Sequence, residues 1–222
     1  MWKSIIYKEW IKTRSAIIVI AAVFVGIGIY SFMKTNEGIR MSGIVNVWET
    51  LVQKDSPMFP NFQFLPLLAG VLLAIIQYVP ELQFKRLKLT LHLPMNDNKI
   101  LLAMLLYGIA IVALLVLVSL PLLLWGLSRH FPAEIVRTSF QQLFPWFLAG
   151  PAAYLITSWV CLEPQWKQRV MNIVAALLFL SFFLLQAKSG AYGPFLPYLI
   201  VALMVSFFFS FYSTARFKEG VQ

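Results

Sequence analysis

Long apolar runs alternate with charged segments along the whole chain. Six of these runs contain no Asp, Glu, Lys, Arg or His, and each is at or near the roughly 20 residues that a helix needs to cross a bilayer core. They cover residues 15–33, 62–80, 100–127, 141–161, 170–187 and 194–213. The pattern predicts an all-α membrane protein with six transmembrane helices.

The charges and the lengths of these segments limit what else the chain can contain. Ionisable groups inside a membrane commonly mark proton relays or ion paths, and the six runs carry none, which argues against proton-coupled transport. The longest connection, 34–61, has 28 residues, far fewer than a typical soluble domain. We therefore expect a single transmembrane domain, 1–222, whose driving energy comes from another polypeptide.

Composition and charge place the chain at a membrane and orient it there. Only 12% of the residues are charged and 60% are hydrophobic, whereas about a quarter of the residues of soluble domains are charged. The net charge of +9 comes from residues beside the runs, where anionic lipid attracts them, so lipid is the expected partner and nucleic acid is not. Six spans put both termini on one side, which holds twelve of the eighteen Lys and Arg. The positive-inside rule then predicts cytoplasmic termini.

The segment before the first run, 1–14, has an amphipathic pattern. Its basic residues lie mostly outside one apolar helical arc, as in a helix that lies in the membrane interface, and we call this segment the elbow. Glu9 falls inside the arc and is expected to pair with Lys12 or with a group outside this helix. The apolar residues of the arc are Trp2, Ile5, Ile6 and Trp10.

Two further segments have features that interrupt the apolar pattern. In 34–61, apolar residues recur near helical spacing over 44–51 and predict a short interfacial helix. One interpretation is that this loop shapes an outer gate; the favoured one is that Trp48 and Phe59 are aromatic anchors at headgroup level. In the fourth span, Gly150 and Pro151 follow Pro145, and prolines free backbone carbonyls that protein or water must cover. A dimer seam or substrate path near Gly150 and Pro151 is one interpretation, and a packed kink is the other.

Few polar side chains lie in the spans, and interhelical hydrogen bonds are their expected role. The last two spans are rich in phenylalanine, which favours a hydrophobic or amphipathic cargo, although phenylalanines that face lipid give the same pattern. The polar residues are Gln77, Ser119, Thr157, Ser158, Asn172, Ser181, Gln186 and Ser206.

The connection between the second and third spans, 81–99, has two apolar stripes and one polar stripe when drawn as a helix. Two apolar faces indicate two contacts, one with the helix ends and one with a cytoplasmic partner. The strict alternation over 87–93 also fits a strand, but no second strand-like segment exists on that side to pair with it. Pro94 ends the helix, and Asn96 or Asp97 is expected to cap the third span. The polar stripe is Glu81, Lys85, Lys88 and His92, and the apolar stripes are Phe84, Leu87 and Leu91, and Leu82, Leu89 and Leu93.

This connection resembles the coupling-helix region of type-2 ATP-binding-cassette exporter permeases. The likeness consists of an acid after the second span, Glu81, a Leu-Pro ending at Pro94 and a lysine before the third span, together with the Lys8-Glu9 pair in the elbow. Where that family has Gly-Thr and an acid, this chain has basic residues, which predicts a more basic docking surface. The residues expected to couple to an ATPase are Glu81, Phe84, Leu87, Lys88, Leu91, Leu93 and Pro94, and those of the elbow are Lys8, Glu9 and Trp10.

The resemblance implies a permease in a bacterial inner membrane that exports its cargo. It would pair with a second permease chain, the same or related, and with two copies of a separate ATPase that use ATP and Mg²⁺, while this chain binds no cofactor. It is not expected to be an enzyme, because its sequence has none of the familiar catalytic motifs. The alternatives are the substrate-binding subunit of a vitamin importer, a non-transporting scaffold or sensor, and, for 81–99, a basic loop that only binds anionic lipid.

Overall fold

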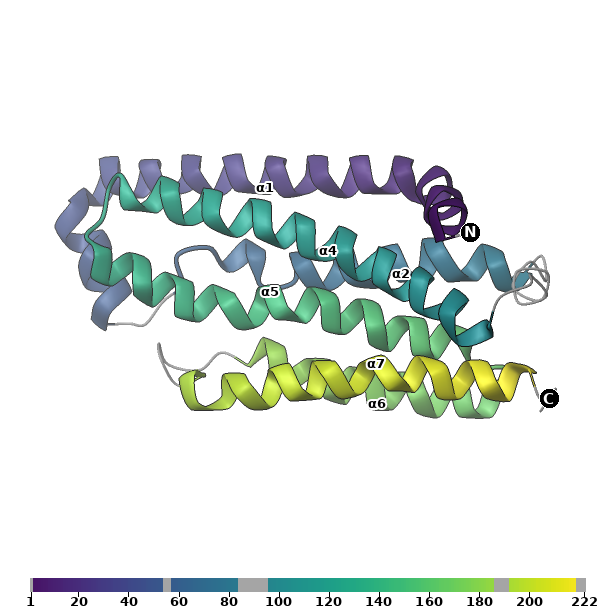
Figure 1. Ribbon diagram of the computed structural model, residues 1–222. Coiled ribbons are helices and arrows are strands. Elements are labelled where there is room, and N and C mark those ends of the chain that lie inside the picture. The colour runs from purple at the N-terminus through teal and green to yellow at the C-terminus, as the bar shows by residue number, and fades with distance from the viewer. Residues whose placement is uncertain (1, 54–56, 84–95, 186–191, 219–222) are drawn as a thin grey trace.

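The computed structural model describes residues 2–53, 57–83, 96–185 and 192–218. In these ranges it contains six helices that are long and apolar enough to cross a membrane, gathered in one elongated bundle (Figure 1). The predicted all-α architecture with six spans is therefore confirmed. The helices are α1 (Trp2–Gln53), α2 (Leu65–Gln83), α4 (Asp97–Ser128), α5 (Ala133–Leu162), α6 (Trp166–Leu184) and α7 (Leu196–Lys218), with short 3-10 turns η1 (Pro60–Phe62) and η2 (Gly193–Phe195).

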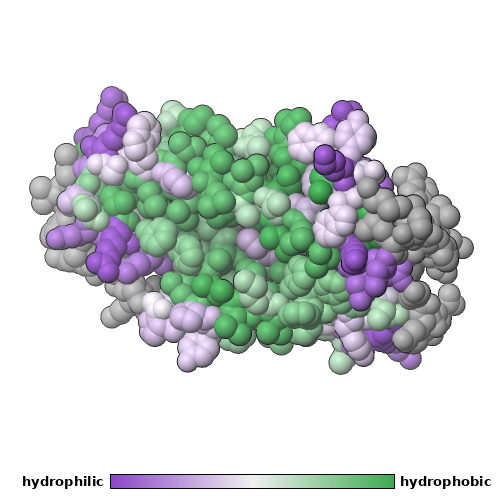
Figure 2. Space-filling model, viewed as in Figure 1, coloured by the Kyte–Doolittle hydropathy of each residue, from purple (hydrophilic) through white to green (hydrophobic). Residues whose placement is uncertain are grey.

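The two termini lie at the same end of the bundle, as an even number of crossings requires (Figure 1). We call this the termini end and the opposite one the far end. In the space-filling view a broad apolar belt separates polar residues that gather at the two ends (Figure 2). Because a bilayer solvates such a belt and water solvates the ends, the fold is that of a multi-pass membrane protein.

Helix α5 is the centre of the bundle. It packs against α2, α4, α6 and α7, whereas α1 packs against α2 and α4. Two thirds of the most apolar window of α5 (67%) is buried, against 17% for α1, α6 and α7. These three outer helices therefore present most of their apolar surface to lipid or to another chain.

The contact between α2 and α5 depends on glycine. A Cβ atom added to Gly70 would lie 2.2 Å from the carbonyl oxygen of Gly150 and 2.9 Å from the backbone nitrogen of Tyr154. Neither atom belongs to a side chain that can turn away. Small residues allow membrane helices to approach this closely and to gain dispersion energy along the contact.

Helix α1 consists of two helical pieces joined at Gly43. This residue has φ 78° and ψ 156°, a conformation that glycine adopts without the steric cost paid by other residues. The second piece, which ends at Gln53, contains the helix predicted over 44–51. Toward the N-terminus α1 is helical from Trp2, and Figure 1 shows its first turns at an angle to the rest. The interfacial placement of the elbow stays a prediction.

The far end of the bundle has an aromatic core around η1. Phe59 and Phe62 are each 1% exposed, and the ring of Phe62 stacks on Phe147 of α5 at 5.9 Å. Phe32 of α1 lies edge-on to Phe59 at 5.8 Å. The prediction that Phe59 is an anchor at headgroup level is therefore wrong, because Pro60 begins a turn that folds both rings inward. The side chain of Trp48 lies outside the described residues.

Candidate functional site: a buried charge cluster at the termini end

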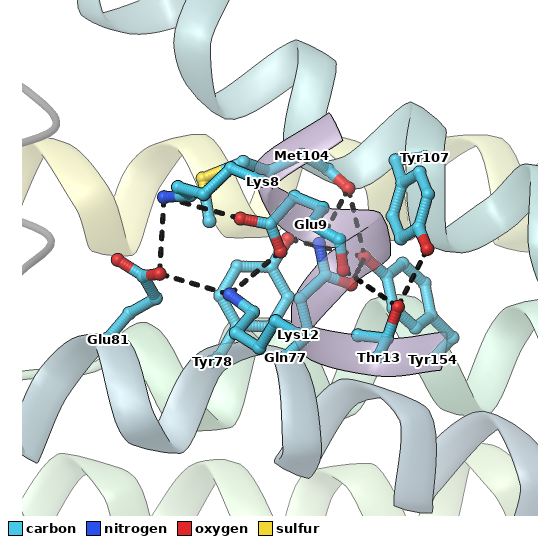
Figure 3. Close-up of polar contacts among 10 residues, drawn as sticks. All are labelled: Lys8, Glu9, Lys12, Thr13, Gln77, Tyr78, Glu81, Met104, Tyr107 and Tyr154. Carbon is cyan, nitrogen blue, oxygen red and sulfur yellow. Dashed lines mark hydrogen bonds and ion pairs between the residues drawn. The ribbon is translucent and has the colours of Figure 1, made fainter. Parts of the chain in front are cut away.

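Four charged side chains form a closed ring between α1 and α2, which we call the four-charge cluster (Figure 3). Lys8 Nζ lies 3.1 Å and Lys12 Nζ lies 3.0 Å from Glu81 Oε1. The same lysines reach Glu9, at 3.4 Å from Lys8 and 2.8 Å from Lys12. With two positive and two negative groups the ring is neutral, as buried charges require.

The cluster is enclosed by the bundle. The side chain of Glu9 is fully buried, and those of Glu81 and Lys12 are 5% and 16% exposed, while Lys8 reaches solvent. The contacts of Glu9 are ion pairs without hydrogen-bond geometry, so within the described part of the chain two lysines compensate its charge. Removing the charge of any one of the four side chains would leave a net charge in this enclosed site. Such a change typically costs several kcal/mol.

The local sequence explains why these groups meet. Ile5, Glu9 and Thr13 are buried on one face of α1 because residues four apart share a helix face. Trp2 and Trp10 share the apolar arc in the sequence, yet they are 41% and 46% exposed. Glu9 therefore interrupts the apolar arc because it points into the bundle, where it pairs with Lys12 as the sequence allowed.

Thr13 extends the cluster to α4. Its hydroxyl donates to the carbonyl oxygen of Glu9 at 2.8 Å and lies 2.7 Å from the hydroxyl of Tyr107. Because threonine has a single hydroxyl hydrogen, Tyr107 is the donor in the second bond. The first turns of α1 are thus bound to both α2 and α4.

A second polar layer lies beside the cluster and joins α2, α4 and α5 (Figure 3). The hydroxyl of Tyr154 donates to Gln77 Oε1 at 2.8 Å, and Gln77 Nε2 donates to the carbonyl oxygen of Met104 at 3.0 Å. The hydroxyl of Tyr78 lies 3.3 Å from that of Tyr154. The interhelical role predicted for Gln77 is confirmed. The same prediction is wrong for three serines whose hydroxyls donate to carbonyl oxygens of their own helices, namely Ser119, Ser181 and Ser206. The hydroxyl of Ser158 also donates within its own helix, to the carbonyl oxygen of Tyr154. Gly108 makes room for this layer, since a Cβ there would lie 2.0 Å from the Tyr154 ring.

A separate ion pair fastens α5 to α7 at the termini end. Arg216 Nη1 lies 3.0 Å from Glu163 Oε1, and Ser213 donates to Glu163 Oε2 at 2.7 Å. Arg169 of α6 donates to the carbonyl oxygen of Glu163 at 2.6 Å. With Glu163 1% exposed, this pair is nearly as enclosed as the four-charge cluster.

These arrangements can fix helices relative to one another. Each charged group in the four-charge cluster faces an oppositely charged one, and the tyrosine and glutamine side chains beside it are hydrogen-bonded to neighbouring helices. Among the described residues there is no group of three or more His, Cys, Asp or Glu side chains that could hold a metal ion. The contacts of the site are those that hold α1, α2, α4 and α5 in a fixed arrangement.

Only part of the predicted coupling site falls in the described residues. Glu81 lies in the last turn of α2, and Asn96 caps α4 by accepting a hydrogen bond from the backbone nitrogen of Asn98 at 3.1 Å. That cap was predicted and is confirmed. The other coupling residues lie outside the described residues and their role stays a prediction. They are Phe84, Leu87, Lys88, Leu91, Leu93 and Pro94.

The structure places Gly150 in the interior of the bundle. It lies in the contact between α2 and α5, where a Cβ would be 3.1 Å from the carbonyl oxygen of Pro66, while Pro151 is half-buried. A packing role thus accounts for this glycine without a partner chain. A dimer seam or substrate path near Gly150 and Pro151 stays a prediction.

Sequence reasoning missed Thr13, Tyr107 and the buried tyrosines of the second layer. Hydropathy counts tyrosine with the apolar residues, yet its hydroxyl must find a partner when the ring is buried. A tyrosine in the middle of an apolar run was therefore the available signal. The pair between Glu163 and Arg216 was also missed, and it joins residues far apart in the sequence.

Comparison of this chain with protein-family models, with curated proteins and with solved structures finds no match. The function is therefore inferred from the residues and their geometry.

Proposed function

We propose that this chain is the permease subunit of an ATP-binding-cassette exporter in a bacterial inner membrane, with both termini in the cytoplasm. A separate ATPase, in two copies, would hydrolyse ATP with Mg²⁺. A second permease chain would complete the transporter. The cargo would be hydrophobic or amphipathic.

The observation that carries this proposal is the four-charge cluster. Glu81 is the last charged residue of α2 before the segment 84–95, the predicted docking surface, and its carboxylate contacts Lys8 and Lys12 of the elbow. A force applied to the segment would thus reach two helices together. A loop that only binds lipid has no need of this buried connection.

The packing of the bundle supports a rigid-body movement. Thr13 and Tyr107 join α1 to α4, the close approach at Gly70 joins α2 to α5, and Glu163 and Arg216 join α5 to α7. Interfaces packed in this way switch between discrete arrangements more readily than they deform. Closure of the ATPase dimer would therefore rock each bundle as a unit between inward-facing and outward-facing states.

The shape of the interior favours this role over that of a vitamin-binding subunit. Binding a hydrophilic vitamin requires a concave site with several convergent polar groups. The cavity between α1 and α4 is lined almost entirely by apolar side chains along its length. A hydrophobic cargo suits such walls better.

The proposed docking surface can be tested by replacing Leu91 with aspartate. Where the gene beside this chain encodes an ATP-binding-cassette ATPase, we expect Leu91→Asp to abolish co-purification with that ATPase, because a charge on the apolar stripe cannot enter an apolar groove without a partner. The complex of the unmodified permease with the ATPase is expected to hydrolyse ATP when reconstituted. The permease alone is not expected to hydrolyse ATP. Co-purification is read by affinity capture, and hydrolysis by phosphate release.

Met41→Asp is the matched control for that experiment. Met41 is 81% exposed and lies on α1 toward the far end, so the same change in charge should leave the complex intact. Both variants must elute as one symmetric peak in gel filtration. A complex that survives Leu91→Asp, or one lost equally with both variants, would refute docking at this segment.

The proposed orientation predicts which residues an impermeant maleimide can reach. The chain has one cysteine, Cys161, and Cys161→Ser removes its thiol. In that background, Met41→Cys should be labelled in intact cells because the far end would face outward. Trp166→Cys, 71% exposed at the start of α6, should be labelled only after the membrane is permeabilised. The reverse pattern would invert the topology and place 81–99 outside, where no ATP-driven partner could act on it.

A further inference from the structure

A cavity of about 630 Å³ lies between parts of α1 and α4. Its walls are apolar along most of its length, and wall residues such as Val25, Val118 and Leu122 are also exposed at the outside of the bundle. The cavity therefore borders the lipid phase. A void of this size is within the usual range for a small-molecule site.

The far end of the cavity differs from its walls. Asn36, Arg129 and His130 line it there. The guanidinium of Arg129 lies 4.0 Å from the ring centroid of Trp125, a cation–π contact that restrains its position. Glu37 follows Asn36 on α1 and is exposed, but it does not line the cavity. The lining thus combines an interior of aliphatic and aromatic side chains, with Ser119 among them, and a mouth with one guanidinium and further hydrogen-bonding groups.

We propose that this cavity binds one acyl chain of an anionic phospholipid, with the lipid phosphate at Arg129 and His130. Guanidinium groups bind phosphate through paired, charge-assisted hydrogen bonds, and basic pockets between membrane helices bind anionic head groups. This inference goes beyond the transporter proposal and does not depend on it.

The dimensions agree with this ligand. The α4 wall extends from Leu114 to Arg129, which at 1.5 Å per residue is about 22 Å. One leaflet contributes roughly 15 Å of the hydrocarbon core. A chain of ordinary length, with its phosphate at the mouth, is therefore accommodated within the cavity.

Gly28 offers a way to fill the cavity. It lines the α1 wall, and a Cβ there would meet no atom within 4 Å, so a larger side chain can enter without displacing the backbone. Gly26 is equally open but does not line the cavity. Gly28→Phe and Gly26→Phe are thus a matched pair.

Lipid binding is measured by native mass spectrometry of the purified chain titrated with dioleoyl phosphatidylglycerol or dioleoyl phosphatidylcholine. The unmodified protein is expected to retain phosphatidylglycerol about tenfold more tightly, the effect of roughly one charge-assisted contact. Arg129→Gln should remove this preference. Arg137→Gln, which changes an exposed arginine on α5 outside the cavity, should preserve it.

Gly28→Phe should weaken the binding of both lipids. Gly26→Phe should leave the binding of both lipids unchanged. Equal binding of the two lipids by the unmodified protein would overturn the proposal, as would equal effects of Arg129→Gln and Arg137→Gln. If Gly28→Phe instead dissociates a dimer and leaves lipid binding unchanged, a second copy of the chain fills the cavity and the proposal is wrong.

Discussion

Replacing Glu81 with glutamine is expected to lower the free energy of unfolding by about 3–5 kcal/mol. The change leaves Lys8 and Lys12 facing one carboxylate, and Lys12 is only 16% exposed. For a chain of this size the loss corresponds to a midpoint of thermal unfolding lower by roughly 10 °C. The midpoint is read from tryptophan fluorescence in detergent at a fixed heating rate.

The matched control is Glu37→Gln, which removes an exposed carboxylate on α1. Its effect should stay within about 0.5 kcal/mol, as for most surface substitutions. If the two variants unfold at the same temperature, the four-charge cluster does not hold α1 to α2, and the mechanical argument for coupling loses its basis.

A double variant separates stability from coupling. Lys12→Leu with Glu81→Leu removes one charge of each sign and leaves Lys8 beside Glu9, so the site stays neutral. Exchanging a buried ion pair for apolar groups is often neutral for stability or favourable. We expect near-normal unfolding but reduced ATP-driven transport in the reconstituted complex, since the directed contact between the elbow and α2 is gone. Normal transport would assign the cluster to stability alone.

The fold was predictable because a membrane imposes its requirements on short stretches of sequence. Each span needs about 20 consecutive apolar residues, a property of composition that can be read without knowing any neighbour. The cap at Asn96 was predictable for the same reason, since its partner is the backbone of Asn98, two residues away.

The candidate site was only partly predictable, because its contacts join distant parts of the chain. The sequence singled out Glu9 as a charge inside an apolar arc, and Glu81 as an acid beside a span. Nothing local showed that Lys12 would bridge the two, since 69 residues separate it from Glu81. The polar role of Tyr154 was missed because hydropathy counts tyrosine as apolar. The burial of Phe59 was missed because the turn that buries it is irregular.

The cavity lies between residues of α1 and α4 that are far apart in the sequence, so it is also a property of tertiary packing. Gly28 and Gly70 both lie in apolar runs and look alike in the sequence. One faces open space, and the other lies against the backbone of α5. The different environments predict opposite responses to substitution by alanine.

Replacing Gly70 with alanine is expected to destabilise the bundle strongly. The new Cβ would lie 2.2 Å from the carbonyl oxygen of Gly150, and relief requires α2 and α5 to separate. Overpacking of this kind costs typically 1–3 kcal/mol and occasionally more. We expect the upper part of that range, because separation also strains the bond between Gln77 and Tyr154.

Two other glycines make the test quantitative. At Gly150 the nearest atom to an added Cβ is 3.1 Å away, and at Gly26 no atom lies within 4 Å. Alanine is the better helix former by about 1 kcal/mol, so Gly26→Ala should raise the unfolding temperature or leave it unchanged. Gly150→Ala should fall between Gly26→Ala and Gly70→Ala. Any other order would mean that the approach of α2 to α5 does not limit the stability of the bundle, and a bundle so loosely joined could not transmit a rigid-body movement from Glu81.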